Sequence, residues 1–230
     1  MAARSKEETV PIDYTKRQQP PDAPAPPAPP VPGGGGTVSL TKDKPTVSLS
    51  KGGGASGQMR VNLNWQSGGG GGLFRKAQSI DLDLACLWEL ADGRKGVVQA
   101  LGNAFGSLQA PPYVLLDGDD RSGTAGGGEN LIVNLDHLDQ IRRILVFAFI
   151  YEGTPAWDRA QAVVTLFPVG AAPIEIRLEE SSGMRTVALA MLENVGGQLS
   201  VRRENRYIDG SQSELDRQYG WGMNWKAGRK

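Results

Sequence analysis

The chain has 230 residues, enough to bury one large core or two small ones. Its 25 basic and 25 acidic side chains cancel, so no overall field exists that would attract nucleic acid or an anionic membrane surface. The single cysteine, Cys86, excludes an internal disulfide and is expected to be a buried, inert thiol, and the single histidine, His137, is expected to be an ordinary polar residue.

Residues 1–36 are predicted to be a disordered tail rich in proline and glycine. Eight of the thirteen residues from Pro20 to Pro32 are proline, a composition that forms polyproline II and neither a sheet nor a core. PxxP spacings such as Pro24 with Pro27 suit a groove on a partner protein, although a semi-rigid spacer has the same composition. One folded domain is expected over residues 37–230.

Extended N-terminal strands are predicted over residues 37–51, because a short repeat occurs there. The sequence TVSLT at 37–41 is followed nine residues later by TVSLS at 46–50, and both copies alternate apolar with small polar side chains. Two unattached arms of this kind could add to the sheets of a neighbouring molecule. This possibility motivates a self-assembling structural or scaffold protein as an alternative function.

The glycines from Gly52 to Gly57 match the spacing of a dinucleotide-binding fingerprint. That fingerprint requires a helix directly afterwards, but residues 59–65 have the alternation of a strand. We therefore interpret these glycines as a loop between strands.

The remaining chain shows strand patterns separated by short turns. Strands are predicted over residues 80–90, 96–101, 113–116, 131–135, 143–151, 161–167, 174–178, 186–193 and 198–203. Helical signal is limited to a turn over residues 136–142 and to residues 211–219, where Ser211 and Glu214 have the spacing of a capping box. Many short strands at regular spacing predict an all-β fold, an antiparallel β-sandwich of two packed sheets with short helical turns.

A loop rich in carboxylates and glycines, residues 117–130, joins two of these strands. Asp117, Asp119, Asp120 and Glu129 concentrate negative charge within thirteen positions, and a bound cation would offset that charge. Calcium fits best, because it accepts six to eight hard oxygens in loose geometry. The loop is not an EF-hand, since its sixth position is Ser122 and its twelfth is Gly128.

A second acidic pair, Asp81 and Asp83, lies on one face of the strand predicted over residues 80–90. These carboxylates could complete the cation site, and the alternative is that they stand isolated on a solvated face. A further alternative is a carboxylate-based hydrolase that uses Asp83 and Asp119 as acid and base.

Two features near the C-terminus are interpreted as structural. The basic stretch of Arg202, Arg203 and Arg206 is expected to form a solvated strand face, because the chain has no net positive charge. Trp221 and Trp225 are expected to pack a C-terminal element onto the sandwich, since no basic groove accompanies them for nucleic-acid binding.

Three stretches, in order and spacing, resemble the TerD-like tellurium-resistance and stress-response family: IDLDLACLWELADGRKG at 80–96, LDGDDRSG at 116–123 and ENLIVNLDHLDQIRRILVFAFIYEG at 129–153. The proline-rich front, the TVSL repeat and KGGGASGQMRVNLNW at 51–65 are similar to the TerA-type branch of that family. The resemblance runs from about Thr37 to Trp225.

The resemblance implies a cytoplasmic β-sandwich that binds calcium through its acidic loop and has no catalytic reaction or catalytic residues. It implies that the protein works with other proteins of a resistance system at the inner membrane. From the residues themselves, the TVSL repeat leaves a homo-oligomer possible, and the balanced charge predicts no binding to nucleic acid. By matching motif, the family's ligands fall on Asp81, Asp83, Asp117, Asp119, Asp120 and Glu129.

The loop also departs from the family pattern. Where typical members read GEGDGDDE, this chain reads GTAGGGEN, so Gly126, Gly127 and Gly128 stand where relatives place acids. Fewer carboxylates predict weaker calcium binding, with one site in place of two. If the cation site is degenerate, the alternative function is that of a self-assembling structural or scaffold protein.

Membrane insertion is not expected. No stretch reaches the roughly 18 consecutive apolar residues of a membrane helix, and the first residues lack the apolar segment of a secretory signal. We expect a cytoplasmic protein that reaches the inner membrane only peripherally, through partners.

Overall fold

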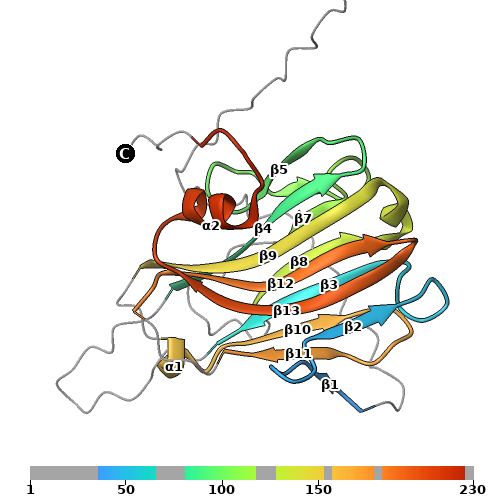
Figure 1. Ribbon diagram of the computed structural model, residues 1–230, viewed down its shortest axis with the longest axis horizontal. Coiled ribbons are helices and arrows are strands. Elements are labelled where there is room, and N and C mark those ends of the chain that lie inside the picture. The colour runs from blue at the N-terminus through green and yellow to red at the C-terminus, as the bar shows by residue number, and fades with distance from the viewer. Residues whose placement is uncertain (1–35, 66–80, 118–127, 153–156, 179–182, 226–230) are drawn as a thin grey trace, which may run out of the picture.

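The computed structural model describes residues 36–65, 81–117, 128–152, 157–178 and 183–225. The tail predicted over residues 1–36 lies outside them, apart from Gly36. The described residues form two packed β-sheets with one short helix against the outside of the front sheet (Figure 1). This arrangement confirms the predicted all-β sandwich.

The two sheets differ in size. The seven-stranded sheet has the order β1 (Val38–Ser39), β11 (Ile174–Arg177), β10 (Val163–Phe167), β3 (Gln58–Asn64), β8 (Glu129–Asn134), β7 (Val114–Leu116) and β6 (Gly106–Ser107). The six-stranded sheet has the order β2 (Thr46–Leu49), β13 (Gln198–Ile208), β12 (Thr186–Val195), β9 (Ile141–Glu152), β4 (Asp81–Leu90) and β5 (Lys95–Val98). All described strand pairs are antiparallel except β1 with β11.

Strand alternation builds the core between the sheets. Leu82, Leu84 and Cys86 of β4 point inward and meet Leu131 and Val133 of β8, and all five are at most 1% exposed. Burial raises the pKa of the Cys86 thiol to about 12, which agrees with the expected inert thiol.

A second, smaller core lies on the other face of the six-stranded sheet. Helix α2 (Gln212–Tyr219) covers this face, and Leu215 packs there with Ala85, Leu87 and Phe147. Strand β4 is therefore buried on both faces, which explains why its sequence is apolar almost throughout.

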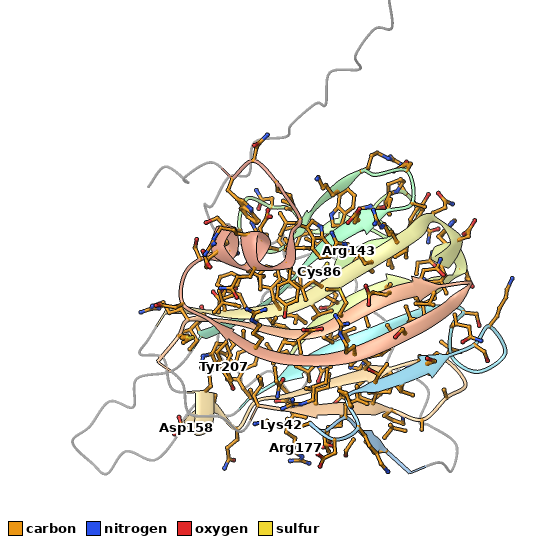
Figure 2. The ribbon with its side chains drawn as sticks, in the orientation of Figure 1. Lys42, Cys86, Arg143, Asp158, Arg177 and Tyr207 are labelled. Atoms are coloured by element: carbon orange, nitrogen blue, oxygen red, sulfur yellow. The ribbon has the colours of Figure 1, made fainter. Side chains whose placement is uncertain are left out.

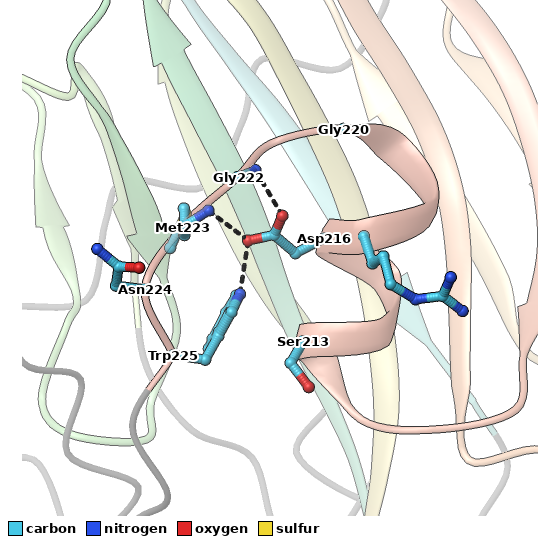
Figure 3. A pocket seen from close by; sticks show the side chains of 8 residues that line it. Ser213, Asp216, Gly220, Gly222, Met223, Asn224 and Trp225 are labelled. Carbon is cyan, nitrogen blue, oxygen red and sulfur yellow. Dashed lines mark hydrogen bonds between the residues drawn. The ribbon is translucent and has the colours of Figure 1, made fainter.

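The C-terminal tryptophans complete that second core. Trp221 is 1% exposed and donates its indole N–H to Trp88 O at 3.0 Å. The Asp216 carboxylate of α2 accepts hydrogen bonds from the N–H groups of Gly222 and Met223 and from the indole of Trp225, at 2.6, 2.9 and 2.6 Å (Figure 3). These contacts confirm that the tryptophans pack a C-terminal element onto the sandwich.

The TVSL repeat supplies one strand to each sheet. The first copy forms β1, parallel to β11, and the second forms β2, antiparallel to β13. Leu40 and Leu49, at matching positions of the repeat, are both buried, at 4% and 6% exposure. The two arms are thus paired within this chain at one side of the sandwich.

The helices differ from the predicted ones in three details. The turn over residues 136–142 is the 3-10 helix η1 (Leu135–Gln140), and the short helix α1 (Trp157–Ala160) was not predicted. Ser211 is the N-cap of α2, but its hydroxyl contacts Ser213 and makes no capping bond, so the predicted capping box is wrong. None of the described helices is long and apolar enough to cross a membrane.

Candidate cation site

The acidic pair at the start of β4 is buried. Asp81 is 8% exposed and Asp83 is 1% exposed, so the alternative of a solvated face is wrong. Asp83 shares its face of the strand with Ala85 and Leu87, since side chains alternate along β4. A bulge in the pairing of β4 with β9 follows Asp81 directly.

Glu129 begins β8 and points into the space between the sheets. It has the same strand parity as Leu131 and Val133, and it is 2% exposed. Its Oε2 accepts a hydrogen bond from the backbone N–H of Leu84 at 2.5 Å. Glu129 therefore joins the two sheets and lies on the main chain of β4 next to Asp83.

The backbone of β4 is open at this point because β5 is short. β5 pairs with Cys86 to Glu89 and ends before Leu84, so none of the described strands continues the pairing on that side of Leu84. The carboxylate of Glu129 takes the place that a strand carbonyl would have. A hydrogen bond of this kind to a charged acceptor is stronger than one between neutral groups.

Asp117 lies in a different environment, at the end of β7. Its N–H donates to Asn130 O at 3.0 Å, which continues the pairing of β7 with β8. Burial raises the pKa of Asp117, and its hydrogen bonds with Asn130 and the charge of Arg60 oppose this effect. Burial lowers the pKa of Arg60, which the charge of Asp117 opposes.

Arg60, Asn62 and Asn130 form a polar cluster on the outer face of the seven-stranded sheet. The Asn130 Oδ1 accepts from Asn62 Nδ2 at 2.8 Å and from Arg60 Nη1 at 3.2 Å. The Arg60 guanidinium also lies over the Phe167 ring, 4.2 Å from its centre. We did not predict this cluster, although Arg60 and Asn62 alternate with the buried Val61 and Leu63 and so share one strand face.

The structure thus divides the predicted ligands. Glu129 is turned inward against β4 near Asp83, whereas Asp117 is turned toward the outer cluster with Asn130 and Arg60. Asp119 and Asp120 lie outside the described residues. Within the ranges that the structure describes, no three or more His, Cys, Asp or Glu side chains are grouped to hold a metal ion. The six-residue ligand set stays a prediction.

The donor chemistry near β4 matches a hard cation. Asp81, Asp83 and Glu129 offer carboxylate oxygens, which calcium prefers, and no nitrogen or sulfur ligand of the kind preferred by zinc is part of this set. His137 lies stacked on Tyr113, with ring centres 4.2 Å apart, and its Nδ1 is 3.2 Å from Gln140 Nε2. It is an ordinary polar histidine, as expected.

Comparison with known proteins gives one close sequence match. No protein-family model matches the chain. The chain is 49% identical over 199 residues to the tellurium resistance protein TerA of an Alcaligenes species, an alignment that covers 84% of this chain and 58% of that protein. The chain therefore spans less than two thirds of the length of this relative.

Two solved structures are similar in fold. The crystal structure of SAV2460, a protein of unknown function, matches with a TM-score of 0.55 and 17% identity, covering 76% of this chain and 99% of that one. The crystal structure of SCO6318 from Streptomyces coelicolor A3(2), a homologue of the telluride resistance protein TerD, has a TM-score of 0.49 and 20% identity, covering 74% of this chain and 99% of that one. The first likeness agrees with the observed sandwich.

Proposed function

This chain belongs to the TerD-like tellurium-resistance family, in its TerA-type branch, and from that premise we propose that it is a calcium-binding, non-catalytic stress-response module. In this proposal the protein acts by assembling with other proteins of the same resistance system. It works in the cytoplasm and reaches the inner membrane only through those partners. Its proline-rich tail is a candidate contact for one of them.

The observation that carries the calcium proposal is the burial of two carboxylates at the start of β4, those of Asp83 and Glu129. They come from different sheets and are 1% and 2% exposed, and Glu129 Oε2 accepts the N–H of Leu84, the residue that follows Asp83. Because Asp83 leaves β4 on the face of Ala85 and Leu87 and Glu129 reaches it from between the sheets, an ion held by both would lie at the edge of β4. Taking two negative charges out of water is unfavourable, and a divalent cation held by their oxygens offsets that cost. Asp81 would be a third ligand, and Asp117, Asp119 and Asp120 of the loop would supply the others.

We predict that calcium stabilises the folded protein, because an ion that binds only the native state shifts the unfolding equilibrium. At a calcium concentration about ten times the dissociation constant, the gain is about 1.4 kcal/mol. Thermal unfolding and titration calorimetry with calcium, in chelator-treated protein, measure this gain. Magnesium serves as the comparison ion, since it demands a stricter geometry.

Asp83→Asn is expected to abolish most of the calcium response while it keeps the size of the side chain. Asp43→Asn, at an exposed position in the connection between β1 and β2, is the matched control. If millimolar calcium leaves both the heat signal and the melting temperature of the unmodified protein unchanged, the calcium proposal is wrong. If the calcium response survives in Asp83→Asn, the ion is bound by other ligands.

The two alternatives gain no support from an observation in the structure. The scaffold function was motivated by two unattached arms, and β1 and β2 are paired within this chain. The hydrolase requires Asp119 beside Asp83, and Asp119 lies outside the described residues. A screen against sugars and phosphoesters, with Asp119→Asn as its control, tests the hydrolase.

A further inference from the structure

A cavity of about 400 Å³ lies where the chain crosses from one sheet to the other. Its walls come from the connection between β1 and β2, from β11 and from β13, with Ser39, Thr41, Lys42, Glu175, Arg177 and Arg203 among the lining residues. Figure 2 shows Lys42 and Arg177 near one another, below β2. This volume is in the range of small-molecule sites, about 300 to 1,000 Å³.

The lining is strongly positive in a chain without net charge. Lys42, Arg177 and Arg203 carry three positive charges against the one negative charge of Glu175, which leaves a local excess of two. Glu175 is paired with Arg177 at 2.7 Å. The lining therefore carries positive charge that a bound anion can offset.

Arg203 occupies an unusual position for a cation. It has the strand parity of Leu199 and Val201, which are 1% and 0% exposed and face the core between the sheets. The earlier expectation of a solvated strand face is therefore wrong for Arg203, which is half-buried and lines the cavity. Among the residues that the structure describes, its guanidinium makes no hydrogen bond or ion pair. A half-buried cation in this state is stabilised by an anion that it can reach.

The cavity walls are fixed by hydrogen bonds on every side. Leu40 N donates to Glu175 O at 2.9 Å, and Arg203 N donates to Pro45 O at 2.7 Å, so the connection is tied to both sheets. The Asn205 side chain donates to Arg177 O at 2.7 Å and links β13 to β11. A site whose walls are already in place loses little entropy when it binds a ligand.

The donor types favour a phosphate group. Arginine guanidinium groups match phosphate oxygens with paired N–H donors, and lysine adds a compact charge. Thr41 Oγ1 accepts the N–H of Lys44 at 3.2 Å, which holds the hydroxyl in place while its own hydrogen can still be donated.

We propose that this cavity binds the phosphate group of a small molecule, with Arg203, Arg177 and Lys42 as the charged ligands of that group. The cavity is larger than a phosphate ion needs, so it has room for the organic part of a nucleotide or a similar metabolite. The inference goes beyond the proposed calcium function and shares no residue with the cation site.

Titration calorimetry of the full chain with inorganic phosphate and with ADP tests the proposal. The buffer contains a chelator and no calcium, which removes any contribution from the cation site. The unmodified protein is expected to bind at least one of the two probes with a dissociation constant of about 1 mM or lower. Tighter binding of ADP assigns the site to a phosphorylated molecule, and equal affinities assign it to free phosphate.

Arg203→Gln is expected to weaken binding by roughly tenfold or more, as the loss of a charged hydrogen bond does. Arg202→Gln is the matched control, because Arg202 is the adjacent residue on the opposite face of β13. The affinity of this variant for phosphate and ADP is expected to be unchanged. Arg177→Gln provides a second test that does not disturb the core, since the Arg177 side chain is 59% exposed. Absence of binding to both probes overturns the proposal. Equal losses in Arg202→Gln and Arg203→Gln, or affinity unchanged in both Arg203→Gln and Arg177→Gln, overturn it as well.

Discussion

Asp117 and Glu129 show how far two carboxylates of one loop can differ in their surroundings. Glu129 accepts a backbone hydrogen bond inside the sandwich, and Asp117 faces Asn130 and Arg60 on its outer side. Burial raises the pKa of Asp117 above the ordinary value, so the folded state binds its proton more tightly than the unfolded state does. Ionised Asp117 therefore lowers the stability of the protein.

We predict that Asp117→Asn is more stable, relative to the unmodified protein, at pH 7 than at pH about 3. Below the ordinary aspartate pKa of about 3.9, both states of the unmodified protein are protonated and the unfavourable contribution is absent. It develops as the pH rises through the range between that value and the higher pKa of the folded state. The difference is below about 1 kcal/mol, because the carboxylate is partly open to water.

Urea unfolding at several pH values, without calcium, measures this difference. Asp209→Asn, at an exposed position after β13, is the control that replaces a carboxylate away from Asn130 and Arg60. A stability difference for Asp117→Asn that is constant with pH would contradict the raised pKa. Added calcium is expected to reverse the order of stability at pH 7 if Asp117 is a ligand.

The sequence singled out the acidic residues as candidate cation ligands, but it did not predict the directions in which their side chains point. Alternation is reliable inside a strand, which is why Asp83 could be assigned to one face of β4. No such rule relates Asp117 to Glu129, because a loop of irregular backbone separates them. The partners Arg60 and Asn62 come from β3, and the pairing of β3 with β8 is a long-range contact.

At the scale of elements, Gly128 fixes the start of β8. Its φ is +62°, and a Cβ atom there would lie 2.1 Å from Leu63 O of the paired strand β3. The close approach of the two backbones excludes any side chain at this position, a carboxylate included. The packing of β8 on β3 therefore requires glycine here.

Gly128→Ala is predicted to destabilise the protein by more than about 2 kcal/mol, because it adds a steric clash to an unfavourable backbone conformation. Gly196→Ala isolates the backbone part. Gly196 has φ +61° in the turn between β12 and β13, and a Cβ there would meet no atom within 4 Å. It is expected to cost only about 1 to 2 kcal/mol. If chemical denaturation shows equal losses of stability for Gly128→Ala and Gly196→Ala, the steric clash at position 128 is relieved without a cost in free energy.

Most strands were predictable because their alternation is regular, and the misses have physical causes. β13 was expected to end at Arg203, but it continues to Ile208 through a residue of positive φ, Asn205. The register of β12 with β13 shifts at this point, so the apolar pattern changes phase. The two residues of β6 and the single turn of α1 are too short to carry a period.

At the scale of the whole molecule, β1 and β2 close the same side of the sandwich. β1 covers the edge of β11, and β2 covers the edge of β13. Sequence alternation predicted both arms as extended, but it contains no information on which sheet each arm would join. The two copies are nearly identical and still belong to different sheets.

A chain that begins at Gln58 is predicted to be less stable and to associate into larger particles than the full chain. Its loss of β1 and β2 would expose the backbone edges of β11 and β13, and open edges pair with other molecules. It would also remove the buried side chains of Leu40 and Leu49 from the core. Light scattering and thermal unfolding of both chains measure these effects.

A chain that begins at Gly36 is the control, since it keeps both strands and is expected to behave as the full chain does. Smaller particles from the chain that begins at Gln58 would contradict this prediction. That result would show that the arms link molecules together, which is the scaffold alternative.

The allocation of two near-identical copies to two sheets also has a consequence for folding kinetics. Because both copies read TVSL, the second copy can occupy the place of the first beside β11 with the same side-chain pattern. Such a state, slipped by nine residues, leaves β13 without its partner β2 and pulls the connection at 40–45 away from both sheets. A molecule that reaches this state must release the wrong copy before β2 can pair with β13, so we expect the repeat to slow folding without changing the final structure.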